Sequence, residues 1–126
     1  MNDEIENAIH SLEEKSKEVL SLFTLQSEIS NEYAKLKTRR EMYYDAFMDP
    51  VVADLLSLTG DKLKKKITSM NIVEQAVTRI HFSICINFTR NLLLCCKEGL
   101  LASIEADVCS SCVNAARSFL AVSLPV

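Results

Sequence analysis

The chain has 126 residues, of which 48% are hydrophobic and 25% are charged. This composition is typical of a folded globular protein and excludes a disordered one. With two glycines and two prolines, the chain cannot supply the many turns that a β-sandwich or barrel requires. The sequence therefore predicts an all-α fold.

The net charge of −3 is the sum of two opposite regions. Residues 1–32 carry eight acidic and two basic side chains, whereas residues 33–66 carry eight basic and five acidic ones. A basic segment in an acidic protein indicates either an anionic partner or attraction between two segments of the same fold. Charge patterning alone leaves both interpretations open.

We expect neither an export signal nor a membrane span. Residues 1–10 are acidic and contain no apolar run behind a basic start. The most apolar stretch, residues 80–104, is interrupted by Arg90 and by Lys97-Glu98, whereas a span needs about 20 mostly apolar residues. We therefore expect a cytoplasmic protein whose five cysteines are reduced thiols rather than disulfides.

Two apolar stripes with helical spacing succeed each other in residues 1–49. The first comprises Ile5, Ile9, Leu12, Ser16, Val19 and Phe23. The second comprises Leu22, Leu25, Ile29, Leu36, Tyr43 and Phe47. The register changes over residues 21–27, where Ser21, Thr24 and Ser27 are candidate caps, so we favour a helical hairpin over one helix of about 45 residues. Because a helix pair alone has little core, we expect self-association.

Asp49-Pro50 marks the end of this hairpin and the start of the second predicted part of the chain, residues 50–126. Aspartate suits the N-cap of a helix, and proline suits its first position. A short helix is therefore predicted to follow and to end at Thr59-Gly60.

The remaining residues predict three helices. Asp61 is the candidate cap of the first, whose lysine run over residues 62–66 we expect to be a solvated surface. Asn71 opens the second through a capping-box pattern, and Gly99 ends it. The third spans about residues 100–120. The second and third are apolar around much of their circumference, so we expect them to be buried against each other or within an oligomer.

Cys109 and Cys112 have the C-x-x-C spacing of redox centres and zinc sites. A thioredoxin-like centre requires a βαβ context, and a zinc site requires two further ligands. The candidate pair is Cys95-Cys96, but adjacent residues on a helix point about 100° apart. These two cannot bind one ion together without distorting the helix, so we interpret the cysteines as core residues and expect no metal.

The sequence contains no catalytic constellation. Neither His10 nor His81 has the neighbours that a nucleophile requires, so we expect both histidines at the surface or at an interface. Gly60 and Gly99 are too far apart for a glycine-rich phosphate loop. The chain is therefore predicted not to be an enzyme and to have no cofactor and no small-molecule substrate.

Four basic residues within six positions form the candidate binding site: Lys35, Lys37, Arg39 and Arg40. On a continuous helix centred on Leu36, two of these cations lie on each flank of the apolar stripe. Such cations either pair with glutamates of a partner helix, as in a coiled coil, or reach over the bundle to phosphates. The acidic first helix supplies candidate partners at Glu6, Glu13, Glu14 and Glu18. In an antiparallel dimer the cluster would be duplicated into a longer basic track.

The residues around this cluster resemble those of a known family. The matching positions are Ala34-Lys35-Leu36, Arg40, Val51-Val52-Ala53 and Leu55. They are similar to the second helix and proline turn of the nodavirus suppressors of RNA silencing, small helical proteins that bind double-stranded RNA. Asp3, Ile5, Ala8 and Ile9 are similar to that family's first helix. The similarity covers at most residues 3–55.

This resemblance implies a helical hairpin that dimerises into an antiparallel four-helix bundle. One face of the bundle would lie along A-form RNA and contact phosphates and 2′-hydroxyls without reading sequence. Binding would shield long duplexes and sequester small interfering RNAs, the action of a viral suppressor of RNA interference in the host cytoplasm. Lys35 and Arg40 match basic residues of the family's RNA-facing helix, and Lys37 and Arg39 are added on charge alone.

The chain departs from the family in its second half, which is apolar and helical where the family is polar and loosely ordered. Pro50 also lies one residue later relative to the Val-Val-Ala that follows, and the turn between the helices is shorter. The alternative function is a non-enzymatic coiled-coil scaffold or subunit of a larger assembly. A third is a regulator whose apolar C-terminal half receives a partner helix.

Overall fold

The computed structural model describes residues 2–24, 26–100 and 110–123. All regular secondary structure within these ranges is helical, so the predicted all-α class is confirmed. The helices are α1 (Asn2–Leu20), α2 (Ser27–Lys35), α3 (Arg39–Met48), α4 (Pro50–Ser57), α5 (Gly60–Thr68), α6 (Ile72–Glu98) and α8 (Ser110–Ser123). Within these ranges no helix has both the length and the apolar character needed to cross a bilayer.

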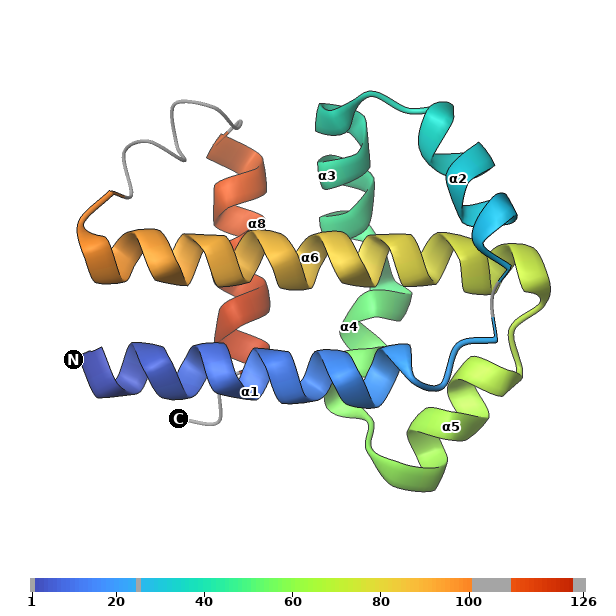
Figure 1. Ribbon diagram of the computed structural model, residues 1–126, viewed down its shortest axis with the longest axis horizontal. Coiled ribbons are helices and arrows are strands. Elements are labelled where there is room, and N and C mark those ends of the chain that lie inside the picture. The colour runs from blue at the N-terminus through green and yellow to red at the C-terminus, as the bar shows by residue number, and fades with distance from the viewer. Residues whose placement is uncertain (1, 25, 101–109, 124–126) are drawn as a thin grey trace.

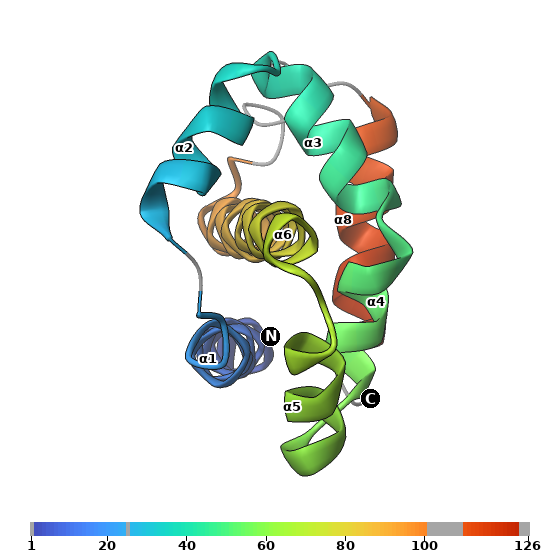
Figure 2. The ribbon, with the colours of Figure 1, turned by 90° about the vertical axis from the view of Figure 1, so that its right-hand side faces the viewer.

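The long helix α6 is the axis around which the other helices are arranged (Figure 1). α1 runs antiparallel to α6, and α3, α4 and α8 cross behind this pair at a steep angle. α2 covers α6 from the opposite side, and α5 lies at the lower end of the molecule beside α4 (Figure 2). Because α1, α2, α3 and α8 all pack on α6, elements from both ends of the sequence meet on one central helix.

Sequence signals define both ends of α6. The side chain of Asn71 accepts a hydrogen bond of 2.9 Å from the backbone N–H of Glu74. Gly99 adopts the left-handed conformation with φ of 74°, and the N–H of Leu100 donates to the carbonyl of Cys95 at 2.7 Å. Both predicted caps are confirmed, and this 27-residue helix is about 40 Å long.

The main core lies between α6 and the helices that surround it. Its side chains with at most 2% exposure include Leu12, Val19, Val52, Leu55, Leu63, Ile67, Phe82 and Cys85. These residues come from α1, α4, α5 and α6, so the core joins segments on both sides of Asp49-Pro50. A smaller cluster of Phe88, Leu92, Val113 and Ala116 joins α6 to α8.

The apolar face of α1 is buried within its own chain. Ala8, Leu12 and Val19 are at most 2% exposed, and α1 packs more extensively on α6 than on any other helix. Nζ of Lys97 lies 2.6 Å from Oε1 of Glu6, which joins the end of α6 to the start of α1. The partner that this amphipathic helix requires is therefore α6.

The predicted second helix of the hairpin is two helices, α2 and α3. The Thr38 hydroxyl accepts a hydrogen bond from the N–H of Glu41, and the Glu41 carboxylate accepts one from the N–H of Thr38. This capping box begins α3 at Arg39, with three residues between it and the end of α2 at Lys35. Leu36, which was expected at the centre of a buried stripe, is 79% exposed. The prediction of one continuous apolar face is therefore wrong.

The helix boundary predicted at Asp49-Pro50 is confirmed, because α3 ends at Met48 and α4 begins at Pro50. Oδ1 of Asp49 accepts a hydrogen bond of 2.9 Å from the N–H of Val51, and Pro50 occupies the first turn of α4. α4 ends at Ser57, as the Thr59-Gly60 pair predicts.

Two other predicted caps are corrected. The chain turns between α1 and α2 as expected, but the residue that precedes α2 is Gln26, whose side chain makes no capping hydrogen bond. α5 begins after Thr59, so Asp61 lies in its first turn instead of capping it. The predicted start of the last helix and Cys109 lie outside the described residues.

Candidate nucleic-acid interface

The four predicted binding residues lie together where α2 meets α3, and we call them the basic corner. Lys35 is the last residue of α2, Lys37 lies in the linker, and Arg39 and Arg40 open α3. All four side chains are exposed. The corner lies at the upper edge of the molecule in Figure 1. Because the helix is broken here, the cations surround a turn and do not flank a helical seam, which corrects the predicted geometry.

Two of the cations pair with carboxylates of the same corner. Nζ of Lys37 donates to Oδ2 of Asp45 at 2.8 Å, and this hydrogen bond and the charge of Asp45 raise the pKa of Lys37. Nζ of Lys35 lies 3.4 Å from Oε1 of Glu32, one helical turn away. Exposed pairs of this kind are weak and are screened by salt, so an incoming phosphate can replace either carboxylate.

The two arginines are positioned differently. Nε of Arg39 donates to the hydroxyl of Tyr43 at 2.8 Å, and the guanidinium carbon lies 5.4 Å from the centre of the Tyr43 ring. This contact orients the Arg39 side chain along α3. Arg40 is exposed beside it. Both arginines stand at the positive end of the α3 dipole, so their positive potential adds to that of the helix terminus.

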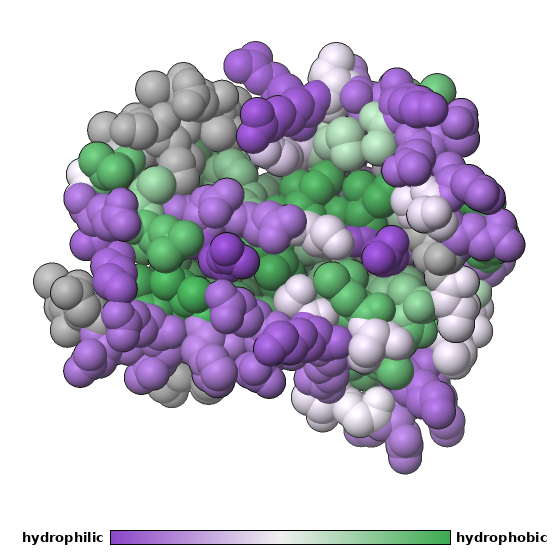
Figure 3. Space-filling view, in the orientation of Figure 1, coloured by the Kyte–Doolittle hydropathy of each residue, from purple (hydrophilic) through white to green (hydrophobic). Residues whose placement is uncertain are grey.

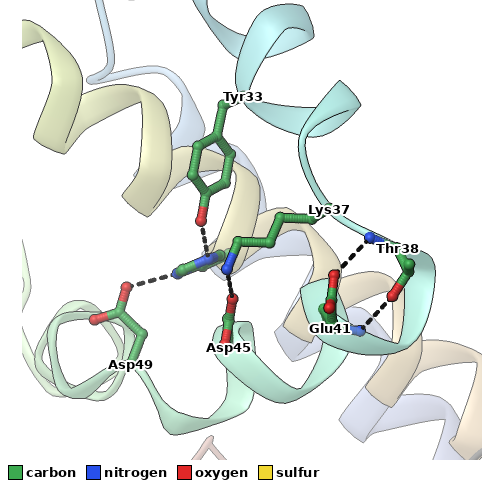
Figure 4. A network of polar contacts seen from close by, with 7 residues as sticks. Tyr33, Lys37, Thr38, Glu41, Asp45 and Asp49 are labelled. Carbon is green, nitrogen blue, oxygen red and sulfur yellow. Dashed lines mark hydrogen bonds and ion pairs between the residues drawn. The ribbon is translucent and has the colours of Figure 1, made fainter.

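A buried polar network lies directly beneath the corner (Figure 4). Nδ1 of His81 lies 2.8 Å from Oδ2 of Asp49, and Nε2 lies 3.2 Å from the hydroxyl oxygen of Tyr33. A neutral imidazole with its proton on Nδ1 donates to the carboxylate and accepts from the tyrosine hydroxyl. The network links α2, α6 and the junction of α3 with α4, and thereby positions both helices that carry the basic corner.

The role of His81 is not the one that the sequence predicted. His10 is exposed, but the His81 side chain is only 7% exposed and is enclosed by its two partners. The sequence did contain a signal, because His81 lies at a helical spacing that places it on the buried side of an apolar helix. Such a shielded imidazole positions its neighbours, since an external substrate cannot reach it.

The cysteines differ in exposure. Cys85 and Cys112 are buried, Cys95 is half-buried and Cys96 is exposed, and all four are free thiols. Burial, aided by the charge of Asp49, raises the pKa of Cys85 well above its usual range. In the part of the chain that the structure describes, no group of three or more His, Cys, Asp or Glu side chains is placed to hold a metal ion.

The chain was compared with protein families, curated proteins and solved structures. No protein-family model, no curated protein and no solved structure matches it. The resemblance to the nodavirus suppressors rests on a short motif, and RNA binding is a proposal.

Proposed function

We propose that this protein binds double-stranded RNA independently of sequence through the basic corner and acts as a suppressor of RNA silencing. The observation that carries the proposal is the gathering of four cations at one exposed turn. Two helices hold that turn, and a buried network fixes both of them. The motif match to the nodavirus suppressors, centred on Lys35 and Arg40, supports the choice of RNA as the anion.

The chemistry of the corner favours contact with the backbone over recognition of bases. Lysine and arginine side chains neutralise phosphates, and A-form RNA offers proteins its phosphates and 2′-hydroxyls more readily than its base edges. Three carboxylates, Glu32, Glu41 and Asp45, lie next to the basic corner in the sequence. On binding, phosphates would take the places of Glu32 and Asp45 beside the lysines, so affinity is expected to be modest and strongly salt-dependent.

The proposal includes a dimer, which would duplicate the basic corner by symmetry. A four-helix bundle made from residues 1–49 would first have to release α1 from α6. A dimer that keeps the present fold would pair through other surfaces, and α3 offers one. Its Tyr44 and Met48 are 52% and 62% exposed and stand one helical turn apart.

A gel shift with a duplex RNA of about 20 base pairs, repeated at several salt concentrations, tests this proposal. Arg40→Ala and Lys35→Ala are expected to weaken binding to every duplex alike and to reduce the slope of log affinity against log salt by about one each. Lys17→Ala is the matched control, because Lys17 is an exposed lysine on α1 that pairs with Glu14 at 3.6 Å. Equal losses in control and test variants would contradict the assignment of the corner.

A second candidate function is a protein-binding subunit, and the exposed apolar side chains favour it. Met48 borders a cavity of 310 Å³ between α3, α4 and α8, whose lining includes Phe47, Leu56 and Phe119. An amphipathic helix of a partner would bury these groups together. Ala53→Lys, at an exposed position that lines the same cavity, is expected to abolish such binding and to leave RNA binding intact, which separates the two functions.

A further inference from the structure

The outer face of α5 carries three exposed lysines, which belong to the run that the sequence predicted as a solvated surface. They are Lys62, Lys64 and Lys65, which we call the α5 lysine face. Among the described residues no carboxylate lies within ion-pairing distance of these three ammonium groups, whereas Lys66 lies 3.5 Å from Asp54. The α5 lysine face is thus less compensated than the basic corner, where carboxylates pair with both lysines.

Helix geometry directs these lysines outward. Leu63 and Ile67 are fully buried and anchor the inner side of α5. At about 100° per residue, Lys65 projects away from Leu63 and Ile67. Lys62 and Lys64 stand on the two sides of Lys65. Asp61 in the first turn shares this outer side and reduces its charge. The arrangement still presents three cations across half the circumference of a two-turn helix.

The position of α5 separates its lysines from the basic corner. Figure 1 shows α5 and the turn between α2 and α3 on opposite sides of the α1–α6 pair, both in the half of the molecule where α6 begins. Figure 2, which looks down the axis of α6, shows the same separation. The two clusters are therefore distinct surfaces of one protomer.

We infer that the α5 lysine face is a second phosphate-binding surface that contacts the backbone of the same duplex RNA, an inference that rests on the proposed function. Both clusters lie at the end of the molecule where α6 begins, so a duplex laid across this end would reach each of them, and with one charge per about 1.7 Å of its axis it offers backbone to both. Modules that recognise duplex RNA by shape contact successive grooves in this way. Two contacts on one protomer would also allow binding before any dimer forms.

The absence of an apolar anchor favours RNA over a membrane. The apolar side chains of α5, Leu63 and Ile67, are buried, so no side chain of this helix can insert into a bilayer. Stable attachment to an anionic membrane takes a second, apolar signal besides a basic patch. Phosphodiester backbone requires only the charges that the lysines supply.

The test compares two triple variants in the full chain. Lys62→Gln, Lys64→Gln and Lys65→Gln together neutralise the α5 lysine face, and Lys17→Gln, Arg90→Gln and Arg117→Gln together remove the same charge from exposed positions on α1, α6 and α8. Duplex RNA binding is measured from about 50 to 200 mM salt. The α5 variant is expected to lose about one unit of salt slope per lysine that contacts a phosphate, and the control is expected to keep the wild-type slope.

The outcomes separate the two proposals. An α5 variant with the wild-type slope overturns this inference alone and leaves the proposed function in place. Equal losses in both triple variants also overturn it, because they would show a general effect of net charge. Failure of the unaltered protein to bind duplex RNA overturns both. If α5 lysines are instead needed only for binding vesicles of anionic phospholipid, the surface belongs to a membrane and the inference is wrong.

Discussion

At the scale of single residues, His81 joins the segments that carry the candidate site. It contacts Asp49 and Tyr33 from the middle of α6, and Asp49 also caps α4 through the N–H of Val51. One imidazole therefore joins the helix that ends at the basic corner to the junction that follows α3. Loss of a buried partner leaves polar groups without hydrogen bonds, which costs more than the bond itself contributes.

His81→Leu is expected to lower the free energy of unfolding by about 1–3 kcal/mol, because it leaves the Asp49 carboxylate and the Tyr33 hydroxyl without their shared partner. Urea denaturation measures the change. Tyr33→Phe removes one hydroxyl and keeps the contact with Asp49, so it should cost less. A loss from Tyr33→Phe as large as that from His81→Leu would contradict the central role of the imidazole.

Thr89, on the same helix, differs from His81 in its hydrogen bonding. Its side chain is fully buried, and within the described residues its hydroxyl oxygen has no hydrogen-bond partner. Thr89→Val replaces this hydroxyl by a methyl group of similar size. The free energy of unfolding should therefore stay equal or rise by about 1 kcal/mol at most. A clear fall in the melting temperature would mean that the hydroxyl does have a partner.

At the scale of elements, the break between α2 and α3 decides the shape of the candidate site. Thr38 and Glu41 have the spacing of a capping box, and this signal lies within the basic cluster itself. The sequence-based prediction used the apolar spacing around Leu36 and overlooked the cap. The caps of α4 and α6 were predictable because Asp49-Pro50 and Asn71 stand outside any competing pattern.

Thr38→Ala should destabilise α3 by about 1 kcal/mol, because the N–H of Glu41 loses its partner. It should also weaken RNA binding several-fold, since Arg39 and Arg40 stand in the turn that the cap organises. Thr38→Ser keeps the capping hydroxyl and serves as the control. Melting curves and gel shifts on both variants check this, and a serine variant as impaired as the alanine variant would contradict it.

The packing partners of the elements could not be derived from sequence. An apolar stripe shows that one face of α1 must be buried, but it does not specify against what. Residues 1–49 were expected to self-associate because a helix pair alone has little core. In the structure that partner is α6, which begins at Ile72 and is linked to α1 by the pair of Lys97 with Glu6.

At the scale of the whole molecule, the fold divides its charge between separate surfaces. The acidic helix α1 runs alongside α6, and on the face seen in Figure 3 hydrophilic side chains border an apolar strip. The basic corner and the α5 lysine face lie on either side of the pair. A protein with a net charge of −3 can thus present two cationic surfaces to a polyanion.

The most direct test of RNA binding is the salt dependence of the unaltered protein with duplex RNA. We predict binding at about 50 mM salt that weakens steeply by about 200 mM, with the same log–log slope for duplexes of unrelated sequence. Single-stranded RNA of equal length should bind more weakly, because a single strand has a lower charge density along its axis than a duplex. Absence of duplex binding at low salt, or a preference for one sequence, would contradict the account.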